Sequence, residues 1–112
     1  MHGLAWMEET LGEITTVAEH CGLRTITKVT LCRGQLSHHF PEELELAWDL
    51  VKQGTICEQA VLVIEEEPAL VSCSACGWEG QWHSELACCQ ACASRVELVS
   101  GTDLQLVDIQ GI

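Results

Sequence analysis

The sequence predicts an α+β fold in which two helices pack on a small three-stranded sheet, with a zinc-ribbon-like four-cysteine domain inserted before the last strand. Three observations lead to this fold class. Two segments carry apolar residues at helical spacing, three shorter segments are apolar or β-branched, and two Cys-x-x-Cys pairs lie between the second and third predicted strands. The order along the chain is helix, strand, helix, strand, cysteine insert, strand.

The first helix is predicted over residues 4–21. Its apolar side chains recur at steps of three and four, which places them in one stripe: Leu4, Met7, Leu11, Ile14, Ala18 and Cys21. Gly22 follows, at the position where helices commonly stop. The next segment, residues 25–32, is β-branched and alternating and ends shortly before Gly34. That pattern predicts the first strand.

The second helix is predicted to begin at Pro41, a residue suited to the first helical position. Glu42 and Glu43 then face the positive end of the helix dipole. The apolar stripe of this helix consists of Leu44, Ala47, Trp48 and Val51. Gly54 follows its end, so we expect the helix to occupy most of the segment from Pro41 to Gly54.

Two short apolar runs predict the remaining strands. Residues 60–64 form the second strand, closed by the glutamates at 65–67, which we interpret as a solvated end and not as a site. Residues 104–109 form the last strand. We therefore expect an α+β domain over 1–69, a zinc-binding domain over 70–99, and a final strand in 100–112 that returns to the first domain.

The chain is strongly acidic. Lys and Arg number 5 against 17 Asp and Glu, a formal net charge of −12. Such a surface repels phosphate, so we expect neither nucleic acid nor membrane as a partner. No apolar run reaches the roughly 18 residues of a membrane span, and no leader segment is recognisable. The paired cysteines then indicate metal binding in a reducing cytoplasm.

The strongest motif is the pair Cys73/Cys76 and Cys89/Cys92, separated by 12 residues. Each Cys-x-x-Cys turn directs two sulfurs at one ion, and two such turns complete a closed tetrahedron, the geometry of structural Zn(II). A closed site has no open coordination position, so its role is structural and not catalytic. Cys88 leaves the register open, since Cys88 to Cys92 would also form a pair; we prefer Cys89 because it repeats the first spacing.

Two disulfides or four free thiols are the alternative for these cysteines. A segment of about 25 residues with few aliphatic side chains would hardly fold without help, whereas metal binding can drive such folding. Trp78 and Trp82 are expected to brace the segment. The remaining cysteines, Cys21, Cys32 and Cys57, are expected to be small buried hydrophobic residues and not ligands.

The N-terminal dipeptide Met1-His2 suggests a second metal site. The α-amine of Met1, the amide nitrogen of His2 and the His2 Nδ1 atom can close fused five- and six-membered chelate rings on one ion. Planar nitrogen donors of this kind suit Ni(II) or Cu(II). The bulk of His2 is expected to protect Met1 from removal, so that the amine survives.

Several segments together resemble the HypA/HybF family of hydrogenase maturation proteins. They are Met1-His2 with the helix after it, the Pro-Glu-Glu-Leu run at 41–44, Gly-Thr at 54–55, the strand 60–64 leading to Pro68, and the paired cysteines. The resemblance implies a nickel metallochaperone. Such a protein would carry Ni(II) to the large subunit of a nickel–iron hydrogenase with a partner GTPase, HypB. It also implies Zn(II) on the four cysteines.

On this resemblance the nickel ligands are the Met1 α-amine, His2 and the backbone of Gly3. The family pattern begins Met-His-Glu, so Gly3 removes a carboxylate but keeps the backbone amide. The second cysteine turn also departs from the pattern, with Gln90 in place of Pro and Ala93 in place of Gly. We expect these changes to loosen that turn without abolishing it.

Three further histidines are candidate donors: His38, His39 and His83, the last of which lies between the cysteine pairs. Two other classes compete with the nickel chaperone. One is a zinc-ribbon protein–protein interaction module without nickel delivery, in which the N-terminal dipeptide is incidental. The other is a small metalloenzyme, for which no Ser/His/Asp arrangement and no His-Glu-x-x-His motif is found. We therefore expect no enzymatic activity.

Overall fold

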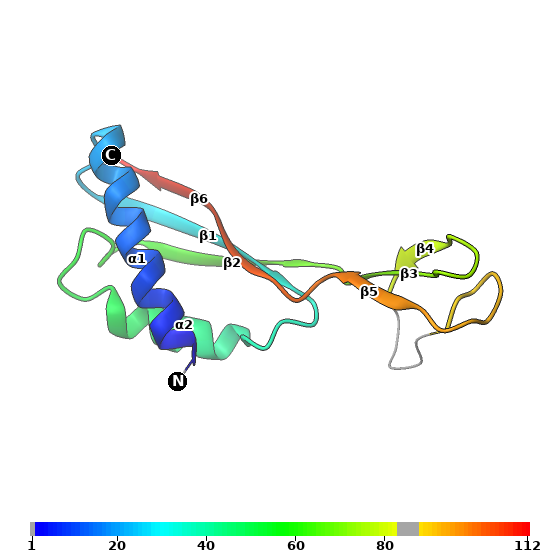
Figure 1. Cartoon of the computed structure of the whole chain (residues 1–112). Helices are drawn as coiled ribbons and strands as arrows, with labels where there is room; N and C mark the ends of the chain where they lie inside the picture. Colours follow the sequence, from blue (N-terminus) through cyan, green and yellow to red (C-terminus); the bar gives the residue numbers. More distant parts are fainter. Residues whose placement is uncertain (1, 83–87) are drawn as a thin grey trace.

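The computed structural model describes residues 2–82 and 88–112, with only the backbone of His2 (Figure 1). The molecule is elongated, with principal extents of 55 × 28 × 17 Å. Figure 1 shows two lobes: one holds both helices and a sheet, and the other is a smaller set of strands joined to it by extended chain. Neither helix of the described chain combines the length and apolar character that a membrane span requires.

The larger lobe, which we call the body, confirms the predicted α+β fold. Its elements are α1 (His2–Cys21), β1 (Ile26–Gly34), α2 (Pro41–Val51), β2 (Val61–Glu67) and β6 (Leu104–Gly111). The strand order is β2-β1-β6, with β1 parallel to β2 and antiparallel to β6. Two parallel neighbours need a crossover connection, and α2 provides it.

One apolar cluster from both helices and the sheet forms the core of the body. Its buried members are Met7, Ile14, Ala18, Ile26, Val29, Leu31, Leu44, Ala47, Trp48, Cys57 and Ala60. The Trp48 indole nitrogen donates a hydrogen bond to the Ala60 carbonyl at 3.4 Å, so the largest buried side chain also has its polar atom paired. Burial of this many apolar groups gives the body a core of its own.

Several helix and strand boundaries differ from the prediction by one to three residues, and two of these differences bear on the fold. The first helix begins at His2, two residues before the predicted start. β2 continues through all three glutamates, because its backbone pairs with β1 as far as Gly34 whatever the side chains are. The glutamate side chains are exposed as expected, and Glu66 reaches the buried Arg33 guanidinium at 3.5 Å.

The prediction that three isolated cysteines are buried was correct only for Cys57. Cys32 is partly exposed, and Cys21 is exposed. Cys21 is the last residue of α1 and lies beyond the buried stripe, which ends at Ala18. None of the three belongs to the four-cysteine cluster described below.

The smaller lobe, which we call the cysteine module, consists of residues 70–82 and 88–100. It contains an antiparallel sheet that the sequence did not predict: β3 (Leu70–Ser72) lies between β4 (Glu79–Gln81) and β5 (Glu97–Ser100). Its buried residues are Val71, Cys73, Cys89 and Val96, with Trp78 and Trp82 packed against them. The expected bracing role of the two tryptophans is thus confirmed.

The chain leaves the body and returns to it at neighbouring points. Gly101 has a φ of 118°, and a Cβ there would lie 2.5 Å from Ala69 Cα. A Cβ on Gly34 would collide with the Gly101 backbone. The Leu36 amide donates to the Gly101 carbonyl at 2.8 Å, and the Ala69 amide donates to Gln35 Oε1 at 3.0 Å. Glycine is therefore required where the two connecting segments pass each other.

Candidate metal centre

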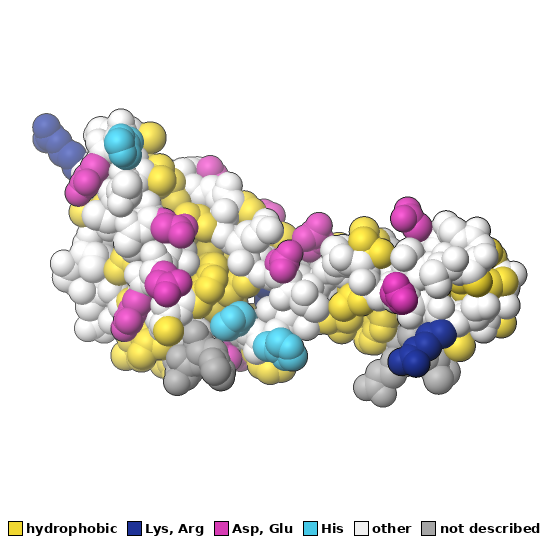
Figure 2. Space-filling view, viewed as in Figure 1, with side chains coloured by type: hydrophobic (Ala, Val, Ile, Leu, Met, Phe, Trp, Pro, Cys, Tyr) yellow, Lys and Arg dark blue, Asp and Glu magenta, His cyan; other side chains and the backbone are white. Residues whose placement is uncertain are grey.

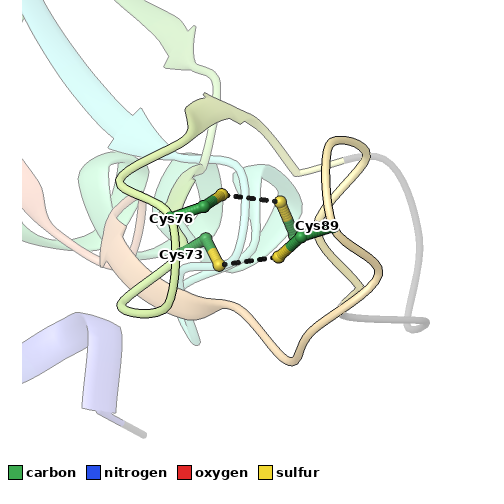
Figure 3. Close-up of side chains that lie close together, drawn as sticks. Cys73, Cys76 and Cys89 are labelled. Carbon is green, nitrogen blue, oxygen red and sulfur yellow. Dashed lines mark hydrogen bonds between the residues drawn. The ribbon is translucent and has the colours of Figure 1, made fainter.

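The structure brings the four paired cysteines into one cluster at the end of the cysteine module (Figure 3). Their sulfur atoms all lie within 4.8 Å of one another. Cys73 Sγ is 3.6 Å from Cys92 Sγ, and Cys76 Sγ is 3.6 Å from Cys89 Sγ. Each close contact therefore joins one turn to the other, as expected when two Cys-x-x-Cys turns face a common centre.

The two turns have the same backbone geometry. The Cys73 carbonyl accepts a hydrogen bond from the Gly77 amide at 2.8 Å, and the Cys89 carbonyl accepts one from the Ala93 amide at 2.9 Å. In both turns the first cysteine also donates its N–H to the carbonyl five residues later, at 2.7 Å. Gly77 and Ala93 both have positive φ, 79° and 62°. Ala93 stands where the family pattern has glycine. The turn still forms, but its positive φ is strained for a residue with a Cβ atom.

The thiol pKa values show how closely the four sulfurs interact. Hydrogen bonds from the Ser94 side chain and backbone lower the pKa of Cys92 to about 6. The Trp78 amide lowers the pKa of Cys76, but the hydrogen bond with Cys89, desolvation and the other two thiols outweigh it and raise that pKa to about 12. Four thiolates this close repel one another, so full ionisation needs a cation among them.

The cluster fits zinc better than it fits disulfides. With Zn–S bonds near 2.3 Å, the sulfurs of a tetrahedral site lie about 3.8 Å apart, close to the 3.6 Å contacts observed. A disulfide would bring two sulfurs to about 2.05 Å. Cys88 is exposed, forms a backbone bridge with Arg95 and is not a member of the cluster. The register with Cys89 is thus the one that the fold adopts.

α1 begins in the body, so the N-terminal candidate site belongs to that lobe and not to the cysteine module (Figure 1). Met1, the His2 side chain and His83 fall outside the described part of the chain. Gly3 is buried, and its amide donates a hydrogen bond to Glu43 Oε1 at 2.8 Å. The sequence did not identify Glu43 as a neighbour of the N-terminal site, because 40 residues separate it from Gly3. An indication was available in Gly3 itself, which stands where the family pattern has glutamate.

His38 and His39 lie beside this site and not near the cysteines. An open hollow of about 490 Å³ is lined by Ala5, Trp6, Glu9, His38, His39 and Glu43. Histidine side chains are visible on this face of the body in Figure 2. Buried Arg33 holds the loop by donating from Nε to the His39 carbonyl at 2.9 Å. The His39 Nδ1 atom is buried and has no hydrogen-bond partner within the described residues.

Comparison with known proteins agrees with this architecture. Residues 1–111 match the family model described as "Hydrogenase/urease nickel incorporation, metallochaperone, hypA". The chain is 31% identical to the hydrogenase maturation factor HypA of Aquifex aeolicus over 111 residues, covering 98% of this chain and 96% of the relative. It is 32% identical to HypA of Moorella thermoacetica over 112 residues, covering 99% of each.

The fold also matches solved structures. The solution structure of the nickel metallochaperone HypA from Helicobacter pylori superposes with a TM-score of 0.71 at 17% identity, over 97% of this chain and 96% of that one. The four-cysteine cluster within that fold fits a structural zinc site. Since the family match spans 1–111 and both relatives exceed 30% identity, this chain belongs to the HypA family of nickel-incorporation metallochaperones.

Proposed function

We propose that this protein binds Ni(II) at its N-terminus and delivers it during maturation of a nickel–iron hydrogenase, while a structural Zn(II) ion holds the cysteine module. The full-length match to the HypA family carries this proposal. The nickel donors are the Met1 α-amine, the amide and imidazole nitrogens of His2, and the Gly3 backbone. The zinc ligands are Cys73, Cys76, Cys89 and Cys92.

The fold supports a nickel site at the chain terminus. Because α1 begins at His2, the amides of its first turn have no intrahelical acceptor and can take other partners, as the Gly3 amide does with Glu43 Oε1. Nitrogen donors in a planar arrangement suit Ni(II). A chelate formed by a chain terminus also suits transfer of the ion, since only a short segment has to move when the cargo is released.

The zinc site serves a different purpose. Four thiolates close the coordination shell, so the ion keeps no position for substrate or water and acts by holding the module together. We assign residues 1–69 to the nickel-binding domain, 70–99 to the zinc domain and 100–112 to the returning strand. A HypB-type GTPase and the hydrogenase large subunit are the proposed partners, in the cytoplasm, and the protein itself has no catalytic role.

Nickel titration of untagged protein tests the proposal. His2→Ala, or one residue added before Met1, should weaken nickel binding by roughly a hundredfold or more, because each removes a donor from the chelate. His20→Ala is the matched control, since His20 is an exposed histidine at the other end of α1. Zinc content should stay the same in all variants.

The competing function gives a different result. A zinc-ribbon interaction module has no use for the N-terminal chelate. Unchanged nickel affinity in both the His2→Ala protein and the extended protein would therefore contradict nickel delivery through this site. The protein would then be assigned to the interaction-module class.

A further inference from the structure

The first turns of α1 and α2 are joined by a hydrogen bond between residues far apart in the sequence. The Gly3 amide donates to Glu43 Oε1 at 2.8 Å. Gly3 is buried and Glu43 is half-buried, so the contact is partly shielded from solvent. A charge-assisted hydrogen bond of this kind to the free amides of a helix start is strong and fixes the first turn.

A side chain at residue 3 would compete for the space that the Glu43 carboxylate fills. A Cβ on Gly3 would lie 2.9 Å from Glu43 Oε1, 3.1 Å from its Cγ and 3.2 Å from its Cδ. Any larger residue would therefore push the Glu43 side chain aside. The missing side chain at residue 3 and the carboxylate from α2 occupy the same place, so the chain keeps an acidic group beside residue 3 although residue 3 itself has none.

The surroundings of this carboxylate favour a cation. Within the described residues Glu43 makes no ion pair, and the ion pairs present join Arg33 to Glu66 and Lys52 to Asp49. The hollow that Glu43 lines contains a second carboxylate, Glu9. The same hollow is lined by His39, whose buried Nδ1 atom has no partner in the described chain. Buried polar atoms are normally paired, so an unpaired imidazole nitrogen here points to a ligand.

We propose that Glu43 is the acidic residue of the N-terminal nickel site. In the metal-free protein its carboxylate accepts the hydrogen bond of the Gly3 amide. When nickel takes that amide nitrogen and the amide proton leaves to solvent, the carboxylate remains as one negative charge beside the ion bound by Met1, His2 and the Gly3 backbone. This inference rests on the proposed nickel function. Glu43 acts as a positioning residue, because the contact that the structure provides is to the Gly3 amide and not to the ion.

The first test compares two neutralised glutamates of the same helix turn. Glu43→Gln should weaken Ni(II) binding by about tenfold or more, because the lost charge is half-buried and close to a divalent ion. Glu42→Gln removes the same charge from an exposed position and should change affinity less than about threefold, since solvent and salt screen it. Zinc content and the thermal midpoint of both proteins serve as the measure of intact folding.

The second test moves the carboxylate. Glu43→Ala should bind nickel as weakly as Glu43→Gln, and Gly3→Glu in the Glu43→Ala background should recover most of the affinity, since it puts an acidic side chain back in the vacated space. A purely structural role of Glu43 predicts no such recovery, because the double variant lacks the bond between Gly3 and residue 43. A double variant as weak as Glu43→Ala would overturn the proposal.

The two proposals fail in distinguishable ways. If His2→Ala loses nickel while Glu43→Gln and Glu42→Gln behave alike, the nickel site stands and the role of Glu43 is wrong. If His2→Ala binds nickel normally, the N-terminal site itself is wrong and the role of Glu43 is lost with it.

Discussion

The body and the cysteine module are folded segments of one chain, but different interactions hold them. The body buries eleven apolar residues in one cluster drawn from two helices and a sheet. The module buries four residues, and two of them are cysteines of the metal cluster. Its strands are three or four residues long, against seven to nine in the body.

This contrast separates two sources of stability. Burial of apolar surface can stabilise the body without any ligand. A module with so small a core falls below the size that burial alone can hold, and metal binding must supply the rest of its folding free energy. Loss of metal should therefore affect one lobe and loss of core packing the other.

The largest expected effect comes from removing one zinc ligand. Cys76→Ser should lower zinc to well below one ion per chain and unfold the module, because a broken tetrahedral site loses most of its affinity. Hydrogen exchange followed by NMR should show fast exchange in β3, β4 and β5 while the amides of β1 stay protected. Cys88→Ser, which changes an exposed neighbour outside the cluster, should keep its zinc. Stoichiometric zinc in Cys76→Ser would refute the assignment.

A smaller loss is expected from the body. Trp48→Ala removes the largest fully buried side chain and should reduce the free energy of unfolding by about 3–5 kcal/mol in urea titrations. Leu50→Ala, on the exposed side of the same helix, should change it by less than about 0.5 kcal/mol. Zinc content should be unaffected by either change. Loss of zinc in Trp48→Ala would show that the two lobes fold as one unit.

The smallest expected effect is a gain within the module. Ala93→Gly relieves the positive φ of the second cysteine turn and should stabilise the zinc-bound form by about 1 kcal/mol, or roughly fivefold in zinc affinity. Ala91→Gly is the matched control, because Ala91 lies in the same turn without positive φ and should give no gain. Competition with a chromophoric zinc chelator measures both. Equal affinities in the two variants would mean that the turn stores no strain.

The difference in core size between the two lobes also explains which of their elements the sequence predicted. Helix periodicity identified α1 and α2, because their cores use one face of the helix and bury Ile14 and Trp48 as expected. Cysteine spacing identified the cluster. The module sheet was missed because strands of three or four mostly exposed residues leave no periodic signal, and β2 was cut short because backbone pairing does not depend on apolar side chains.

The contact between Gly3 and Glu43 was beyond sequence reasoning for another reason. It depends on the angle at which α1 crosses α2, and no pattern within either helix determines that angle. The two Cys-x-x-Cys motifs, by contrast, lie close together in the sequence, and the spacing within each motif is enough to predict that its two sulfurs face one ion. The clustering of the four cysteines was therefore predicted, and the contact between Gly3 and Glu43 was not.

Because Ala69 and Gly101 lie next to each other, the cysteine module could be removed from the chain as one segment. Since the exit and return points of the chain touch, a short turn between them would close the body with little change in chain entropy. The excised segment carries its own sheet and the four thiols of the metal cluster between two adjacent ends. It would therefore be compatible with grafting into the tip of an unrelated hairpin, as a metal-dependent fold whose host need supply only two neighbouring strands.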